Sequence, residues 1–124
     1  MQTQEIMTEQ VVTINGWATV AEAVMLMKYI GLSSLVVSPV DESDTYGIIS
    51  KTDIVYKVIA TGKNLQTVQV KEIMTKPCIT VSPELEVKYT ARLFANTNIR
   101  HALVVEGDLL GIVSISDIFN SQSG

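Results

Sequence analysis

The segment GIISKTDIV at residues 47–55 returns as GIVSISDIF at residues 111–119, so the chain contains two copies of one unit. A second pair supports the duplication, because EIMT occurs at residues 5–8 and again at residues 72–75. The matches have slightly different offsets, which a longer loop in the first copy explains, since loop tips tolerate insertions. Two copies are too few for a solenoid, which needs at least about three repeats. The duplication therefore predicts a closed pair of half-domains.

Composition limits the class of protein. At 124 residues and 47% hydrophobic content, the chain can bury roughly two-thirds of its unfolded surface, which is enough for one compact module. The net charge of −4 argues against a nucleic-acid partner, since such a protein needs a clustered basic face. Cys78 is the single cysteine, so no intramolecular disulfide can form, and a reducing cytoplasm fits. The first ten residues lack the features of a signal peptide and no run is long enough to span a bilayer, so we expect no membrane association.

The pattern along each copy predicts an α/β (α+β) fold in the order β-α-β-β-α. A short apolar strand opens each copy and a helix follows. Two strands joined by an acidic turn come next, and a second, short helix closes the copy. The expected strands are residues 11–14, 35–38 and 46–49, then 78–81, 103–106 and 109–113. We assign residues 1–62 to the first unit, 63–70 to a polar linker and 71–124 to the second unit.

The two long helices have recognisable starts. Thr19 and Glu22 have capping-box spacing, and Ser82 followed by Pro83 predicts an N-cap before a first-turn proline. Apolar residues recur at helical spacing behind both starts, and we expect them to face the core: Val20, Ala23, Val24, Met27 and Ile30, then Leu85, Tyr89, Leu93 and Phe94.

Each copy carries a small polar cluster where the last strand meets the last helix: Ser50, Thr52 and Asp53, then Ser114, Ser116 and Asp117. Hydroxyls beside the free N–H groups of a helix start can complete a phosphate site, and a carboxylate there can accept both hydroxyls of a ribose. The alternative is equally concrete, because Ser, Thr and Asp are also the preferred helix caps. Repetition does not decide between the two interpretations, since a duplicated fold duplicates its caps.

The copies differ in charge next to this cluster. Arg100 and His101 precede a strand of the second copy, whereas Leu32 and Ser33 stand at the equivalent positions of the first. Arginine holds phosphate with a planar fork, and histidine can donate a hydrogen bond or carry charge near neutral pH. The alternative is that both residues complement the dipole of the preceding helix end. The asymmetry predicts that the second copy is the better anion site.

No catalytic set is visible in the sequence. The chain lacks the phosphate loop GxxxxGK[ST], the zinc signature HExxH and paired cysteines, and His101 has no nucleophile motif beside it. The acidic stretches at residues 41–44 and 106–108 lack the ligand spacing of a calcium loop and are expected to be turns. We therefore expect neither an enzyme nor a metal site.

The repeated order of EIMT, an apolar strand, a capped helix, a strand pair and GIxS followed by Asp resembles a CBS domain. Two in tandem resemble a CBS pair, or Bateman module, and the resemblance covers nearly the whole chain. It implies two β-α-β-β-α units packed as a pseudo-twofold pair with two clefts, which in this family commonly bind adenosine-containing ligands. The family's aspartate contacts ribose, the hydroxyls before it contact phosphate, and basic residues assist.

The resemblance assigns residues of this chain to two clefts. One cleft would combine a polar set with apolar neighbours from the other copy beside adenine: Asp117, Ser114, Ser116, Arg100 and His101, with Thr13, Ile14 and Ala18. The mirror cleft would combine the equivalent residues: Asp53, Ser50 and Thr52, with Thr80 and Val81. The second set departs from the phosphate-binding pattern, because it lacks the basic pair.

The leading hypothesis is a regulatory module that senses AMP, ADP or ATP and modulates a separate target protein. The family's tendency to pair also predicts a homodimer. The alternative is a scaffold that dimerises or docks on an enzyme without a ligand, its polar clusters serving only as helix caps.

Overall fold

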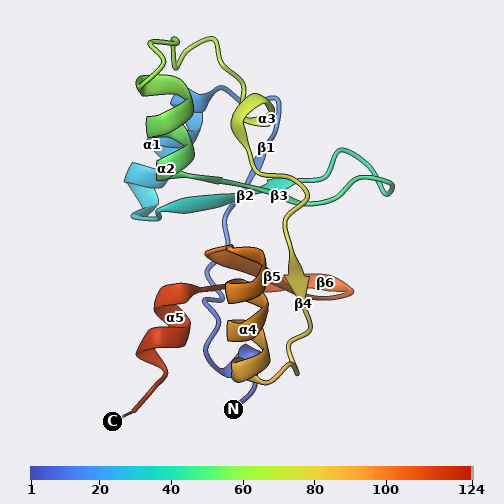
Figure 1. Ribbon diagram of the computed structural model, residues 1–124. Coiled ribbons are helices and arrows are strands. Elements are labelled where there is room, and N and C mark those ends of the chain that lie inside the picture. Colours follow the sequence, from blue (N-terminus) through green and yellow to red (C-terminus); the bar gives the residue numbers. More distant parts are fainter. Residues whose placement is uncertain (124) are drawn as a thin grey trace. The chain divides into compact units, whose positions relative to one another are not determined.

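The computed structural model describes residues 1–123 and contains two three-stranded sheets within them (Figure 1). In each sheet the first strand runs parallel to the second, and the second runs antiparallel to the third. The first sheet consists of β1 (Thr13–Asn15), β2 (Ser34–Ser38) and β3 (Gly47–Ser50). The second consists of β4 (Thr80–Val81), β5 (His101–Glu106) and β6 (Asp108–Ser114).

The helices complete the predicted β-α-β-β-α order in both copies. The first copy has α1 (Val20–Ile30) and α2 (Lys51–Ile54), and α2 continues as the π-helix η2 (Val55–Ile59). The second copy has α4 (Val87–Thr97) and α5 (Ile115–Asn120). Two further short helices stand before the first strand of each copy: the 3-10 helix η1 (Thr3–Glu5) before β1, and α3 (Val70–Ile73) before β4. Within residues 1–123 no helix has the length and apolar character needed to cross a membrane.

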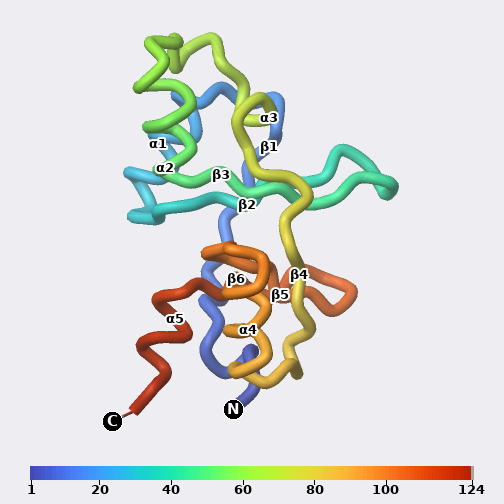
Figure 2. The backbone as a smooth tube through the Cα atoms, viewed as in Figure 1, coloured from blue at the N-terminus to red at the C-terminus, as the bar shows by residue number. Residues whose placement is uncertain are grey.

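The chain forms two compact units that do not coincide with the sequence copies. The central unit is Val12–Cys78, and the terminal unit combines Met1–Val11 with the chain from Ile79 onward. The start of the chain thus packs with the second copy, as Figure 2 shows where the blue segment runs beside α4. The packing units therefore differ from the division predicted by sequence, which was residues 1–62, 63–70 and 71–124.

The two EIMT segments explain this difference, because each pairs with the last strand of the other copy. Thr8 and Ile112 exchange backbone hydrogen bonds of 2.8 and 3.0 Å, and Thr75 and Ile48 exchange bonds of 2.9 and 3.0 Å. Each segment thereby covers an otherwise unpaired strand edge. The glycine of each GIxS motif permits the approach: a Cβ on Gly111 would lie 2.8 Å from the Sδ of Met7.

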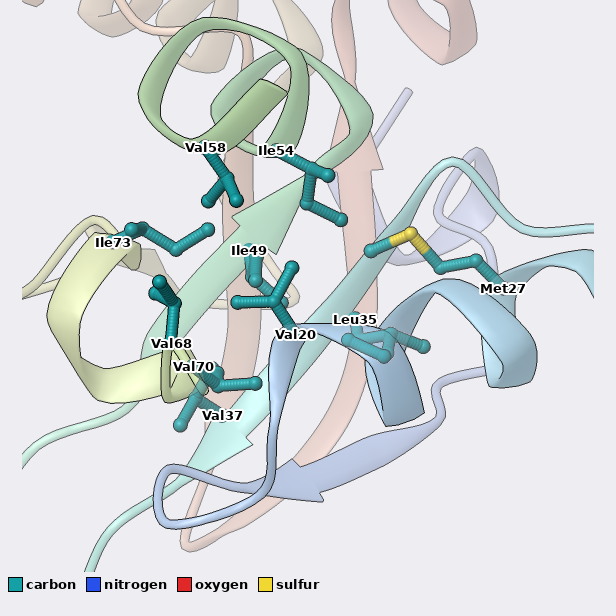
Figure 3. Close-up of a cluster of buried hydrophobic side chains, with 11 residues drawn as sticks. Val20, Met27, Leu35, Val37, Ile49, Ile54, Val58, Val68, Val70 and Ile73 are labelled. Atoms are coloured by element: carbon teal, nitrogen blue, oxygen red, sulfur yellow. The ribbon is translucent and has the colours of Figure 1, made fainter. Parts of the chain in front are cut away.

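The core of the central unit lies between its helices and the first sheet (Figure 3). Leu35 and Val37 alternate along β2 and face the same cluster as Val20 of α1, as the period of a strand requires. The segment 63–70, predicted as a polar linker, contributes Val68 and Val70 to this core. The prediction missed this role because the segment is ordered by distant backbone partners: Val20 donates to the Val68 carbonyl at 2.8 Å.

Capping predictions had different outcomes in the two long helices. The Thr19 hydroxyl accepts from the Glu22 amide at 3.1 Å, so the capping box of α1 is confirmed. The N-cap predicted at Ser82 is wrong, because α4 begins at Val87. The carbonyls of Pro83 and Leu85 accept from the amides of the chain's first residues, which holds the segment after Ser82 outside the helix.

The predicted core stripe of α4 is correct only in part. Phe94 is buried in the cluster of the terminal unit, and Leu85 and Leu93 pack against it. Tyr89, however, is 45% exposed. The buried face of α4 runs through Val87, Thr90 and Phe94, and Tyr89 lies off this stripe.

Candidate functional site

The predicted polar clusters both form the starts of short helices, with the same geometry in each copy. The Ser114 hydroxyl accepts from the Asp117 amide at 3.2 Å, and Asp117 Oδ2 accepts from the Ser114 amide at 2.9 Å and from its hydroxyl at 3.0 Å. Ser50 and Asp53 repeat these three distances. Both clusters therefore cap their helices, and each aspartate keeps its second oxygen, Oδ1, outside the cap. The ligand role of the same side chains stays a prediction.

The terminal unit brings the basic pair and the hydroxyls of the second copy around one cavity. Arg100, His101, Ser114, Ile115 and Ser116 line a space of about 420 Å³. His101 lies opposite Ser114 in the β5–β6 register, and the Ile115 amide donates to the Arg100 carbonyl at 3.1 Å. These contacts join residues 13 or more positions apart, and four of the five lining residues are ones that the sequence singled out.

Asp117 follows Ser116 of the cavity lining directly in sequence and is the third residue of α5. Its Oδ1 accepts a long hydrogen bond of 3.4 Å from the hydroxyl of Thr8. Sequence reasoning did not identify Thr8 as a member of the site, although its place in the repeated EIMT motif is a signal that could have found it. A half-buried carboxylate with one weakly engaged oxygen can accept hydrogen bonds from a ligand.

The equivalent place in the central unit is chemically different. Asp53 Oδ1 forms an ion pair of 3.1 Å with the ammonium of Lys57, which also donates to the Ile73 carbonyl at 2.8 Å. The backbone arrangement is nevertheless the same, because the Lys51 amide donates to the Ser33 carbonyl at 3.0 Å, as Ile115 does to Arg100. Thr52 is exposed in the first turn of α2.

The remaining predicted residues lie on the first strands or directly after them. Thr13 is exposed in β1, while Ile14 and Ala18 pack against the core of the central unit. Thr80 is exposed in β4, and Val81 is buried in the core of the terminal unit. The predicted grouping of Thr13, Ile14 and Ala18 with Asp117 joins residues of two units and stays a prediction. The same holds for Thr80 and Val81 with Asp53.

The acidic stretch at residues 41–44 is a turn, as predicted, and both of its aspartates have partners. The ammonium of Lys76 hydrogen-bonds Asp44 and, with nearby backbone amides, lowers the pKa of that carboxyl to about 2. Hydrogen bonds from the Ser43 side chain and amide lower the pKa of Asp41. Among residues 1–123 no three His, Cys, Asp or Glu side chains are arranged to hold a metal ion.

Comparisons with known proteins agree with the duplicated fold. The sequence model of the CBS domain matches residues 4–60 and again residues 70–124. The structure of a hexameric CBS-CP12 protein from bloom-forming cyanobacteria superposes with a TM-score of 0.94 at 58% identity, over 98% of this chain and 67% of that one. A protein with CBS domains from Burkholderia ambifaria has a TM-score of 0.85 at 27% identity, over 98% of this chain and 93% of that one.

One relative among curated proteins is an uncharacterized protein of Methanopyrus kandleri. It is 36% identical over 121 residues, which cover 95% of this chain and 61% of that protein. A mitochondrial CBS domain-containing protein of Arabidopsis thaliana is 35% identical over 104 residues, or 81% of this chain and 50% of the relative. The chain thus spans about half to three-fifths of these two relatives.

Proposed function

The chain belongs to the CBS domain family, and from this premise we propose that it senses AMP, ADP or ATP at the cavity beside Ser114 and Ser116. Pairs of CBS domains are generally regulatory, nucleotide-binding modules. The observation that carries the proposal is the convergence of Arg100 and His101 with two serine hydroxyls around one cavity of about 420 Å³. That volume is in the usual range for small-molecule sites.

The chemistry of the lining suits the charged end of a nucleotide. A guanidinium can hold phosphate oxygens with two parallel N–H donors, and hydroxyls add further donors. Asp117 follows Ser116 directly and supplies the acceptor that a ribose diol needs through its Oδ1. The proposed site therefore binds phosphate with Arg100, His101, Ser114 and Ser116, and ribose with Asp117.

Regulation by such a ligand requires two states of the module. We propose that the nucleotide changes the relative orientation of the two units, or the pairing of two modules in a homodimer. A ligand shifts this equilibrium only by its differential affinity for the two states. The module then acts on a separate target protein and performs no catalysis itself.

Isothermal titration with AMP, ADP and ATP tests the site, with wild type, Arg100→Ala and the matched variant Arg92→Ala. Arg92 lies on α4, where its guanidinium is 5.3 Å from the ring centre of Tyr89 and outside the cavity lining. Loss of a charged hydrogen bond costs about 1.5–3 kcal/mol, or roughly a 10- to 150-fold weaker affinity for Arg100→Ala. Equal affinities in both variants, or no binding by wild type, would reject the site.

A second candidate function, a ligand-independent scaffold, is favoured by an apolar groove between α4 and α5. The groove has a volume of about 470 Å³ and is lined mainly by apolar side chains, among which Phe119 is 78% exposed. Exposed apolar patches often mark interaction sites. A dimer alone fits both candidates, so the test joins light scattering with the titration. Failure of AMP, ADP and ATP to bind, together with a dimer that Phe119→Glu dissociates and Asn120→Glu does not, would support the scaffold.

A further inference from the structure

We infer that Lys57 is a specificity-determining residue, which withholds Asp53 from ligands and leaves Asp117 as the single ribose-binding carboxylate of the chain. The inference rests on the proposed function and deepens it, because it states how many nucleotides bind and why. It follows from one difference between two otherwise matching helix starts.

The side chains of the two aspartates make the same hydrogen bonds except at one oxygen. In both copies Oδ2 accepts from the amide of the capping serine at 2.9 Å and from its hydroxyl at 3.0 Å. Oδ1 differs, since it faces the ammonium of Lys57 at 3.1 Å in Asp53 and the hydroxyl of Thr8 at 3.4 Å in Asp117. Apart from the basic pair Arg100 and His101, which the first copy lacks, the contact of Oδ1 is therefore the difference between the two carboxylates that bears on ligand binding.

The position equivalent to Lys57 in the second copy is Ser121, 64 residues later. The Ser121 hydroxyl is uncharged and donates to the Ile118 carbonyl at 2.6 Å. Asp117 thus lacks the cation that Asp53 has at the same spacing of four residues. Pairs at this spacing lie on one helix face, so the contact follows from local sequence.

Lys57 blocks Asp53 in two ways. Its ammonium occupies the oxygen that a ribose hydroxyl would use, and its positive charge reduces the carboxylate's strength as an acceptor. A second bond, from the same ammonium to the Ile73 carbonyl at 2.8 Å, holds the lysine in place. The 3.4 Å bond from Thr8 is beyond the usual length for paired oxygens, so a ligand hydroxyl can displace it at little cost.

A purely structural role of Lys57 predicts a different effect of its removal on ligand binding. If Lys57 served only to join α2 to α3, its removal would lower stability and leave the number of bound ligands unchanged. The specificity role predicts that exchange of residues 57 and 121 between the copies changes the binding stoichiometry. Binding stoichiometry therefore separates the two roles, whereas a melting temperature does not.

The experiment is isothermal titration of the full chain with AMP and with adenosine, which carries no phosphate and so does not need the basic pair. Wild type is expected to bind one AMP. Ser121→Lys is expected to bind AMP about tenfold or more weakly, which corresponds to about 1.4 kcal/mol, whereas Ser121→Met, of similar length without charge, stays within about threefold. Lys57→Ser is expected to add a second adenosine site, and Lys57→Met controls for side-chain length.

The outcomes distinguish this inference from the proposed function. One AMP per chain, lost with Arg100→Ala but unaffected by Ser121→Lys, would keep the function and overturn the inference. Two AMP molecules per wild-type chain, or no adenosine site gained by Lys57→Ser, would overturn it as well. Failure of wild type to bind any of the ligands would overturn both. Circular dichroism confirms that each variant is folded.

Discussion

Replacing Gly111 with alanine tests how the start of the chain joins the terminal unit. An ideal Cβ at this position would lie 2.8 Å from the Sδ of Met7 and 2.8 Å from the carbonyl oxygen of Thr8. The Met7 side chain can rotate away. The Thr8 carbonyl cannot, because it accepts from the Ile112 amide at 3.0 Å while the Thr8 amide donates back at 2.8 Å.

The size of the effect follows from the two ways in which the protein can respond. If the segment stays bound, the overpacked methyl group costs about 1–3 kcal/mol. If it detaches, two backbone hydrogen bonds worth about 0.5–1.5 kcal/mol each are lost. Both routes lower the free energy of unfolding by roughly 1–3 kcal/mol, which in a chain of this length lowers the Tm by roughly 3–15 °C.

Urea denaturation followed by circular dichroism measures the loss, and Gly47→Ala is the matched control. A Cβ on Gly47 would also lie 2.8 Å from a methionine sulfur, that of Met74, but it would be 3.2 Å from the Thr75 carbonyl. We therefore expect a smaller loss in Gly47→Ala. A loss below about 0.5 kcal/mol in Gly111→Ala, the level of an ordinary surface change, would refute the reasoning, and so would the reverse order of the two variants.

Three further predictions concern stability. Thr3→Val leaves the buried hydroxyl of Thr90 without its partner at 2.7 Å and should cost about 1–3 kcal/mol in urea denaturation, part of which the double variant with Thr90→Val restores. Leu35→Ala removes a side chain that is 1% exposed and should cost about 2–5 kcal/mol in the same assay. The pKa of Asp44 is lowered to about 2 by Lys76, so its stabilising effect is full above the unfolded value and is lost as pH falls toward 2. Asp44→Asn should therefore show a weaker decline in stability over that acid range, and an unchanged pH profile would contradict the assignment.

The candidate site could be predicted from the sequence where its contacts are local. Ser114 and Asp117 cap each other across three residues, and the β5–β6 register places His101 opposite Ser114, with Arg100 next to it in sequence. Strand pairing through a short turn makes that register predictable. The pair Asp53 and Lys57 also lies within reach of sequence reasoning, since its spacing of four residues is that of a helix face.

The sequence could not predict which strands the two EIMT segments pair with. Thr8 and Asp117 are separated by 109 positions, and a repeat alone does not say whether a segment pairs with its own copy or with the other. The buried Val68 and Val70 were missed for a related reason. A short segment with polar neighbours has no periodicity of its own, and its burial depends on α1, nearly fifty positions earlier in the chain.

The sequence by itself determined the duplication, the β-α-β-β-α order and the caps of α1, α2 and α5, because these depend on contacts within a few residues or on motifs that recur intact. Only the tertiary structure decided which strand edge each EIMT segment covers, and with it that Thr8 lies next to the Oδ1 of Asp117. Edge pairing is decided by which distant segment can approach the backbone closely, and that approach depends on glycines at positions 47 and 111 having no side chain.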